Sequence, residues 1–345
     1  IPKHPPFDYY TKEYEKGLQL YSKGVLIMDK CADLLPDYFS FVKGLVDSED
    51  LSLNISRETL QHDGQLKLIA KTLEKKIKSE LEKMLKNERE AYEEFFKAFG
   101  IQLKFGIYND YGMHKDQLKD LLIFRSSAEK KYVTLKEYVS RMKEGQNAVY
   151  YACGETDEKI DMLPQADAVK DKGYEILYLT ENVDEFAVKM MGEYDGKKFV
   201  NICDDNLNLD SEDEKKALQE ENDAAKDMFE AMKESIGDKV NAVRFTNKLK
   251  NHPVCLTSEG GISLEMEKVL NSMPGTEQNK VKAQLVLEIN AAHPIAEKLK
   301  KLFESDKDTL SKYSKLLYGE ACLIGGKTVP DPAEHSALVC ELMTK

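Results

Sequence analysis

Apolar residues recur every three or four positions between residues 66 and 84, the spacing that places side chains on one face of an α-helix. The apolar positions are Leu66, Ile69, Leu73, Ile77, Leu81 and Met84. Lysines and glutamates fill most of the positions between them. The pattern predicts a long amphipathic helix with one buried face. A long coiled coil is not expected, because the steps do not hold a strict seven-residue repeat.

Short apolar runs and turns precede this helix. Residues 18–21 and 25–28 are expected to form two strands around Gly24, and residues 41–46 to form a third strand. We expect the pairing partners of the first two strands to lie outside this chain.

Aromatic residues are frequent after the long helix. They predict a helix over residues 90–99 that ends at Gly100 in a left-handed cap. Residues 106–112 are expected to form a loop and residues 118–124 a short helix.

Helical and strand-like segments alternate from residue 134 onwards. Thr134 and Glu137 have the spacing of a capping box. The expected strands are 148–153, 175–179 and 199–202, with helices at 166–172 and 185–191. This alternation predicts a small parallel α/β subdomain. It contains no G-x-G-x-x-G turn, so we assign no nucleotide site to it.

An acidic stretch follows residue 204 and is poor in apolar side chains, which predicts a linker whose second half can begin a helix. Beyond it we expect strands at 240–245, 253–256 and 284–289, and helices at 224–236, 294–304, 310–323 and 332–343. The last two helices are apolar enough to need a partner. The fold class is therefore α/β and α+β. The expected domains are 1–130, 131–203, a linker at 204–220, and 221–345.

Composition narrows the class of protein. The chain has 345 residues, of which 41% are hydrophobic and 32% charged, a globular balance for two or three domains. No apolar run suits a bilayer span, and the N-terminal residues lack the apolar run of a signal peptide. A net charge of −12 argues against nucleic acid or an anionic membrane as a partner. The six cysteines have no C-x-x-C spacing, which indicates thiols in a reducing cytoplasm and no metal site.

Motifs of several enzyme classes are absent from the sequence. There is no G-x-S-x-G, H-E-x-x-H or complete phosphate-loop motif. The run Gly325-Gly326-Lys327-Thr328 superficially resembles the end of a phosphate loop. We interpret it as a turn between two helices, since no strand leads into it.

Polar groups gather just before the long helix. Asn54 or Ser56 can cap that helix, whereas the cation of Arg57 is unfavourable at the positive end of a helix dipole. We therefore expect an external anionic target for Arg57, with Gln61 one turn later on the same face. An arginine fork and a neutral donor suit a phosphate chain. The alternative is an arginine in a local ion pair, which is the commoner arrangement.

Two long motifs resemble one family. The run D-S-E-D-L-S-L-N-I-S-R-E-T-L-Q at 47–61 resembles the middle-domain signature of the heat shock protein 90 chaperones. The run Y-V-S-R-M-K-E-G-Q at 138–146 is similar to their bacterial HtpG form. The resemblance covers essentially the whole chain, from part-way through the middle domain to the C-terminus. It implies a fragment that lacks the N-terminal nucleotide-binding domain.

The resemblance implies a cytoplasmic, ATP-dependent chaperone of the stress response that binds and remodels partly folded proteins. ATP and Mg²⁺ would be held by the absent domain, with no cofactor in this fragment, which should be inactive alone. In the family, the arginine of N-x-S-R-E reaches the γ-phosphate; this residue is Arg57 here, with Gln61 assisting and Asn54 in the same loop.

The resemblance also implies two binding surfaces. The client-binding positions would be Phe186, Ile262, Met266, Val269, Leu270 and Met273. The last five form one stripe of a short helix that carries Glu265, Glu267 and Lys268 on its other side, and the glycines and proline that flank it suggest that it is not tied to its neighbours. Burial in an ordinary core is the alternative for this stripe.

The last two helices resemble the dimerisation element of the family, and we expect them to form a four-helix bundle in a homodimer. The expected interface residues are Leu316, Leu317, Ala321, Leu338, Val339 and Leu342. The C-terminus lacks the acidic pentapeptide that recruits co-chaperones in eukaryotic members. Two other classes stay open. One is a non-enzymatic dimeric scaffold, and the other is a metabolic enzyme with a polar pocket near residues 150–179.

Overall fold

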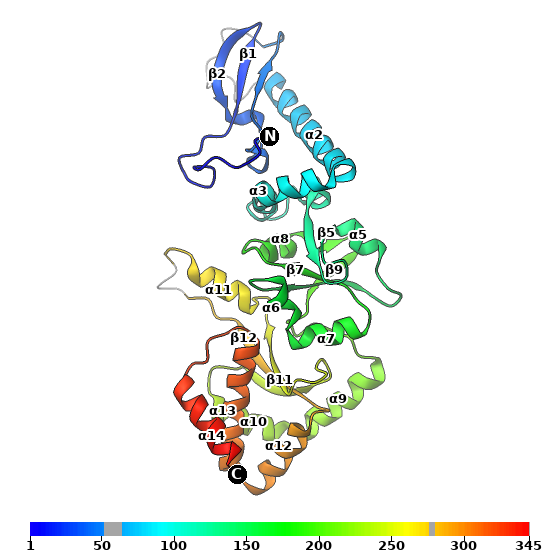
Figure 1. Ribbon diagram of the computed structural model, residues 1–345, viewed down its shortest axis with the longest axis vertical. Coiled ribbons are helices and arrows are strands. Elements are labelled where there is room, and N and C mark those ends of the chain that lie inside the picture. Colours follow the sequence, from blue (N-terminus) through cyan, green and yellow to red (C-terminus); the bar gives the residue numbers. More distant parts are fainter. Residues whose placement is uncertain (52–63, 276–279, 345) are drawn as a thin grey trace. The chain divides into compact units, whose positions relative to one another are not determined.

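The computed structural model describes residues 1–51, 64–275 and 280–344 (Figure 1). The chain forms two compact units. The first unit contains Ile1–Phe124, Lys131–Ser140 and Val183–Gly196. The second unit contains Arg125–Lys130, Arg141–Asn182 and the chain from Lys197 onwards.

A three-stranded sheet opens the first unit. Strand β1 (Leu18–Ser22) pairs antiparallel with β2 (Val25–Cys31) and parallel with β3 (Leu45–Asp47). Lys23 and Gly24 both have positive φ, as a two-residue hairpin turn requires. The two predicted strands are confirmed. The expectation that their partners lie outside the chain is wrong for β1, which has a neighbour on each side.

Two long helices follow in the first unit. The predicted amphipathic helix is confirmed as α2 (Gly64–Asn87), whose apolar face packs on the core of the sheet through Leu66, Ile69, Leu73 and Ile77. The aromatic-rich helix is α3 (Arg89–Tyr108).

The predicted end of α3 at Gly100 is wrong, since both Gly100 and Gly106 lie inside the helix. A Cβ atom at Gly106 would lie 2.4 Å from the Cβ of Tyr38, so close packing requires this glycine. The 3₁₀ helices η1 (Ala32–Leu34) and η2 (Asp37–Phe39) precede β3, and Tyr38 belongs to η2.

Short elements complete the first unit. They are α4 (Lys115–Leu118), η3 (Lys119–Leu121), β5 (Tyr132–Thr134), α5 (Leu135–Ser140), α8 (Asp184–Met191) and β8 (Glu193–Tyr194). The helix expected over 118–124 is wrong in its second half, where β4 (Ile123–Ser126) begins. The capping box is confirmed. The backbone N–H of Glu137 donates to Thr134 Oγ1 over 3.0 Å, and that of Thr134 donates to Glu137 Oε2 over 2.7 Å.

The second unit begins with the predicted α/β subdomain, which is confirmed. Strands β6 (Ala148–Cys153), β7 (Ile176–Leu179) and β9 (Lys197–Asn201) are parallel, and the order within this unit is β4-β7-β6-β9 with β4 antiparallel. Helices α6 (Asp157–Asp161) and α7 (Pro164–Asp171) connect β6 to β7. The strand order reverses between β6 and β9, so a crevice is expected at the carboxyl ends of these two strands.

The rest of the second unit is an α+β assembly. Its sheet has the order β10-β12-β11, from β10 (Ala242–Thr246), β11 (Val254–Glu259) and β12 (Gln284–Asn290). Its helices are α9 (Glu212–Ala224), α10 (Lys226–Ile236), α11 (Leu264–Ser272), α12 (Pro294–Ser305), α13 (Lys307–Ile324) and α14 (Pro332–Met343). One apolar core joins this sheet to α10, α12 and α13. The expected α/β and α+β fold class is therefore confirmed.

Candidate functional site

The expected catalytic residues Asn54, Arg57 and Gln61 lie outside the described residues. The two flanks of this segment share one core, because Leu51 and Leu66 are both buried in the cluster beneath the first sheet. The chain is held just before the segment, where the hydroxyl of Ser22 donates to the carbonyl oxygen of Leu51 over 2.6 Å.

The apolar stripe of α11 is only partly covered. Ser263 caps the helix by accepting the backbone N–H of Met266 over 3.1 Å. Val269 is buried, whereas Met266 and Leu270 are half-buried and Met273 is 42% exposed. The expectation that all five residues share one helix is wrong, because Ile262 precedes the cap and Met273 is the extended residue that follows α11. The half-buried Met266 and Leu270 leave part of the apolar face of α11 uncovered.

The other face of α11 is hydrogen-bonded to neighbouring segments. The expectation that no neighbour holds this helix is therefore wrong. Glu267 Oε2 accepts the backbone N–H of Ala283 over 2.8 Å. The side-chain amide of Asn271 bonds both the N–H and the carbonyl of Val281, over 2.9 and 2.8 Å. These two residues hold the segment that leads into β12, and they replace the ladder bonds that the segment lacks.

A second tie runs from α11 to the turn between α13 and α14. The ammonium of Lys327 lies 3.1 Å from Glu267 Oε1. Sequence reasoning missed the roles of Glu267, Asn271 and Lys327. The four-residue spacing of Glu267 and Asn271 places them on one helix face, but nothing in the sequence indicates their backbone partners.

Phe186 belongs to α8 in the first unit and is buried. Its ring meets that of Tyr108 edge-on, with 5.3 Å between the ring centres. The helix is held to α3 by an ion pair between Lys104 and Asp184. Phe186 therefore has a fixed position in the described structure.

The expected dimer residues divide into two groups. Leu317 and Ala321 of α13 are buried in the core of this chain's own second unit. Leu316, Val339 and Leu342 are half-buried, and Leu338 is the buried residue of α14. The apolar residues available to a partner are thus only part of the predicted set.

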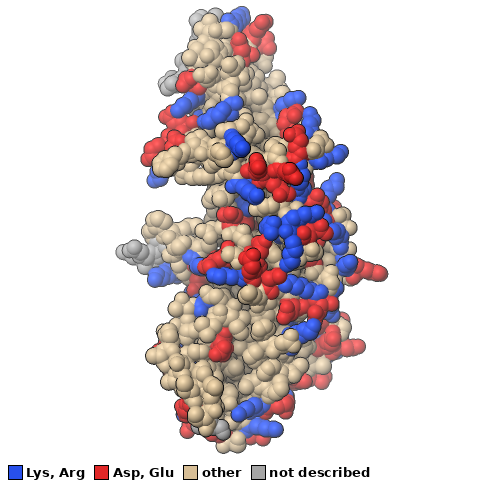
Figure 2. Space-filling model, viewed as in Figure 1, with Lys and Arg blue, Asp and Glu red and all other residues tan. Residues whose placement is uncertain are grey.

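Three polar contacts hold α14 to α13. Lys312 pairs with Glu341 at 2.5 Å, Lys315 with Glu334 at 2.8 Å, and His335 Nε2 with Glu320 at 3.2 Å. Few charged side chains appear over α13 and α14 on the face that Figure 2 shows. Exposed residues on these helices include Leu323, Ala337, Cys340 and Met343.

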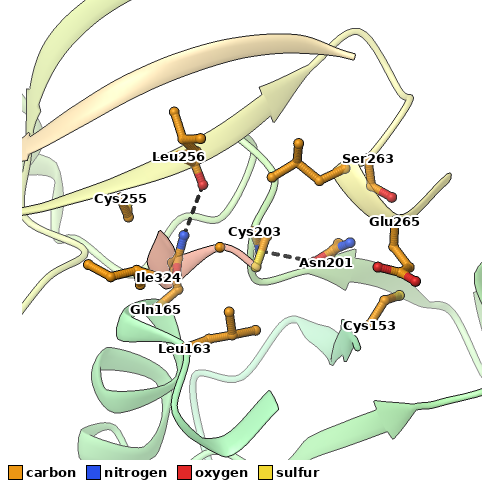
Figure 3. A pocket seen from close by; sticks show the side chains of 12 residues that line it. Cys153, Leu163, Gln165, Asn201, Cys203, Cys255, Leu256, Ser263, Glu265 and Ile324 are labelled. Carbon is orange, nitrogen blue, oxygen red and sulfur yellow. Dashed lines mark hydrogen bonds between the residues drawn. The ribbon is translucent and has the colours of Figure 1, made fainter. Parts of the chain in front are cut away.

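A small cavity lies at the carboxyl ends of β6 and β9, where the strand order predicts a crevice (Figure 3). Its volume is about 50 Å³, and residues from α7, β11, α11 and the end of α13 also line it. Gln165 donates through Nε2 to the carbonyl of Leu256 over 3.1 Å, and its buried Oε1 has no hydrogen-bond partner among the described residues. The cavity has room for water but is far smaller than the 300–1,000 Å³ of typical small-molecule sites.

The described part of the chain contains neither a bilayer-spanning helix nor a cluster of metal ligands. No helix among residues 1–51, 64–275 and 280–344 is long and apolar enough to span a bilayer. Within the same ranges, no three histidine, cysteine, aspartate or glutamate side chains are grouped to hold a metal ion.

Comparison with known proteins agrees with the mixed fold and the two motifs. The family model described as "Hsp90 protein" matches residues 1–345. This chain therefore belongs to the Hsp90 family. It is 58% identical over 343 residues to a protein of Bacillus subtilis named "Chaperone protein HtpG", and 57% identical over 343 residues to proteins of that name from Clostridium perfringens and Halalkalibacterium halodurans. Each match covers 99% of this chain and 54% of the relative, so the chain spans about half the length of these relatives.

Proposed function

We propose that this chain is part of an ATP-dependent molecular chaperone of the HtpG type, which binds and remodels partly folded client proteins. Membership of the Hsp90 family and three relatives named "Chaperone protein HtpG" support this proposal. We place it in the cytoplasm, where the free thiols of Cys31, Cys255, Cys322 and Cys340 would persist.

The observation that carries the client-binding role is the partly covered stripe of α11. An apolar surface that must accept varied sequences benefits from flexible side chains, and two of its five residues are methionines. Met273 is exposed, and Met266 and Leu270 are half-buried. The bonds made by Glu267 and Asn271 keep the helix in place without covering the stripe.

The test uses the double variant Met266→Ser, Leu270→Ser. It should weaken the suppression of aggregation of a heat-denatured protein while leaving the melting temperature of the chain nearly unchanged. If the two residues belong to an ordinary core, each large-to-small change would instead cost about 2–5 kcal/mol. A large loss of melting temperature would therefore contradict the assignment.

We further propose that α13 and α14 form a homodimer through a four-helix bundle. The half-buried residues Leu316, Val339 and Leu342 and the few charges over these helices on the face that Figure 2 shows support this arrangement. Deletion of residues 331–345 should give a monomer by light scattering at micromolar concentration. A dimer that survives the deletion would contradict it.

For catalysis, we propose that Arg57, assisted by Gln61 and Asn54, offsets the charge on the γ-phosphate of ATP held with Mg²⁺ by another domain. In a full-length protein, Arg57→Ala should lower ATP turnover by at least about one order of magnitude. Unchanged turnover in a folded variant would exclude this role.

Two other functions have less support. A metabolic enzyme would need a pocket near residues 150–179, and the cavity there has a volume of only about 50 Å³. A non-enzymatic dimeric scaffold would keep its dimer but would not need Arg57 or the methionines of α11. The two variants above therefore separate a scaffold from a chaperone.

A further inference from the structure

Backbone hydrogen bonds in the turn after α13 fix the position of Lys327. Gly326 has φ +68°, and its N–H donates to the carbonyl of Leu323 over 3.2 Å, while the N–H of Lys327 donates to the carbonyl of Cys322 over 2.8 Å. These two bonds with a left-handed glycine form a Schellman motif, which ends a helix with a defined chain direction. Lys327 is thus fixed to the end of α13.

The side chain of Lys327 bridges from this turn to α11. Its ammonium lies 3.1 Å from Glu267 Oε1, and the two side chains are 29% and 18% exposed. The second carboxylate oxygen of Glu267 accepts the N–H of Ala283, the residue just before β12. One carboxylate therefore joins α11, the chain entering β12 and the end of α13. A partly buried pair of this kind loses less energy to solvent screening than an exposed pair does.

Apolar packing between α11 and the end of α13 is limited to the surroundings of Leu264 and is interrupted by a cavity. Ser263, Leu264 and Glu265 of α11 line the same 50 Å³ cavity as Ile324 and Gly325 of α13 (Figure 3). A cavity at a junction removes dispersion contacts that would hold the two elements together. The polar bridge therefore holds α11 to the end of α13 in addition to the apolar packing of Leu264 on the core that contains α13.

We propose that Lys327 is a positioning residue that couples client binding on α11 to dimerisation through α13 and α14. This inference rests on the proposed function. Client binding and dimer formation both favour the state in which the Glu267–Lys327 ion pair is formed and α11 is fixed relative to α13. Two events that favour the same ordered state strengthen each other, so the coupling is positive and reciprocal.

The experiment measures the dimer dissociation constant of the 345-residue chain by sedimentation equilibrium, with and without saturating reduced, carboxymethylated lactalbumin as the unfolded probe. In the unmodified chain the probe should tighten the dimer by about fivefold or more. Lys327→Arg keeps the cation and should keep this effect. Lys327→Met should abolish it while the chain remains folded by circular dichroism.

Lys268→Met is the matched control. Lys268 lies on the same helix, but its ion pair with Glu155 reaches the loop before α6 and not α13, and both side chains are 54% exposed. This variant should keep the full effect of the probe. A Lys327→Met variant that keeps it too would overturn the inference.

The outcomes distinguish the two proposals. A chain that binds the probe and dimerises, but whose dimer constant does not respond to the probe, would overturn the coupling alone. A chain that neither binds the probe nor dimerises would overturn the proposed function, and the coupling with it.

Discussion

The ammonium of Lys104 lies 2.5 Å from a carboxylate oxygen of Asp184, and the two side chains are only 5% and 3% exposed. The pair joins the middle of α3 to the first turn of α8, two residues before Phe186. The same ammonium lies 5.2 Å and 5.5 Å from the ring centres of Phe96 and Phe124. A buried ion pair among aromatic rings therefore helps to fix the helix that carries Phe186, the aromatic residue expected to contact clients.

Removal of one member of this pair should destabilise the first unit. Lys104→Met leaves the carboxylate of Asp184 buried without its cation, which typically costs about 3–5 kcal/mol. The double variant Lys104→Met, Asp184→Asn should recover part of this loss. Urea unfolding, monitored by tyrosine fluorescence, measures the stability of the single and the double variant. Lys83→Met, which removes an exposed pair on α2, is the control and should leave the midpoint unchanged. Equal midpoints for Lys104→Met and the unmodified chain would contradict the account.

The glycines of α3 are required by packing. Gly106→Ala should gain up to about 1 kcal/mol of helix propensity. It should lose more than this, because the new Cβ would lie 2.4 Å from Tyr38 Cβ and overpacking costs about 1–3 kcal/mol. The melting temperature should therefore fall. In Gly64→Ala at the start of α2, the added Cβ would have no atom of the described residues within 4 Å, so this variant should be neutral or stabilising. A rise in melting temperature for Gly106→Ala would show that the helices can separate freely.

These glycines illustrate what the sequence can and cannot predict. The 3.6-residue period of α2, the capping box at Thr134 and the alternation after residue 134 depend on local rules, and the structure confirms them. In the sequence, a glycine at position 100 is consistent both with a helix cap and with close packing against an aromatic ring. Its role depends on Phe96, whose ring would lie 2.8 Å from an added Cβ.

The candidate site shows the same division. The apolar stripe of α11 is evident from its spacing, since Met266, Val269 and Leu270 follow each other at steps of three and four residues. The bridge from Glu267 to Lys327 joins residues 60 positions apart, and only the folded turn after α13 brings them together. The sequence does not distinguish interface residues from core residues on α13. Leu316 and Leu317 are equally apolar, and only the folded structure shows that Leu317 is buried and Leu316 is half-buried.

The second unit should lose stability in acid through Asp161. Burial alone would raise the pKa of this carboxyl, but hydrogen bonds from Lys170, Tyr178 and Lys130 outweigh burial and lower it to about 2. A carboxyl with a lowered folded pKa stabilises the fold above its unfolded pKa of about 4, and this contribution is lost as the pH falls towards 2.

The variant Asp161→Asn tests this effect. The stability difference between it and the unmodified chain should be largest at pH 6 and should shrink between about pH 5 and pH 2, measured as urea midpoints. Tyr178→Phe removes one of the three donors and should give an intermediate difference at pH 6. A difference that does not change with pH would exclude the ionised Asp161 as the cause.

Burial separates the proposed interface residues from the core residues of α13 and α14. Val339→Asp places a charge on the half-buried face of α14 and should raise the dimer dissociation constant by at least about tenfold without a loss of melting temperature. Leu317→Ala removes a buried side chain of the monomer core and should cost about 2–5 kcal/mol of stability. Sedimentation measures the dimer dissociation constant of both variants, and thermal melts measure their stability. A dimer unaffected by Val339→Asp would exclude this face from the interface.

The most direct test of the client-binding role is the affinity of the 345-residue chain for fluorescently labelled reduced, carboxymethylated lactalbumin, measured by anisotropy. The unmodified chain should bind saturably, and the Met266→Ser, Leu270→Ser variant should bind at least about tenfold more weakly, because it loses apolar surface from the stripe of α11. Equal affinity of the two folded proteins, or no binding by the unmodified chain, would contradict the assignment of α11 as a client-binding helix.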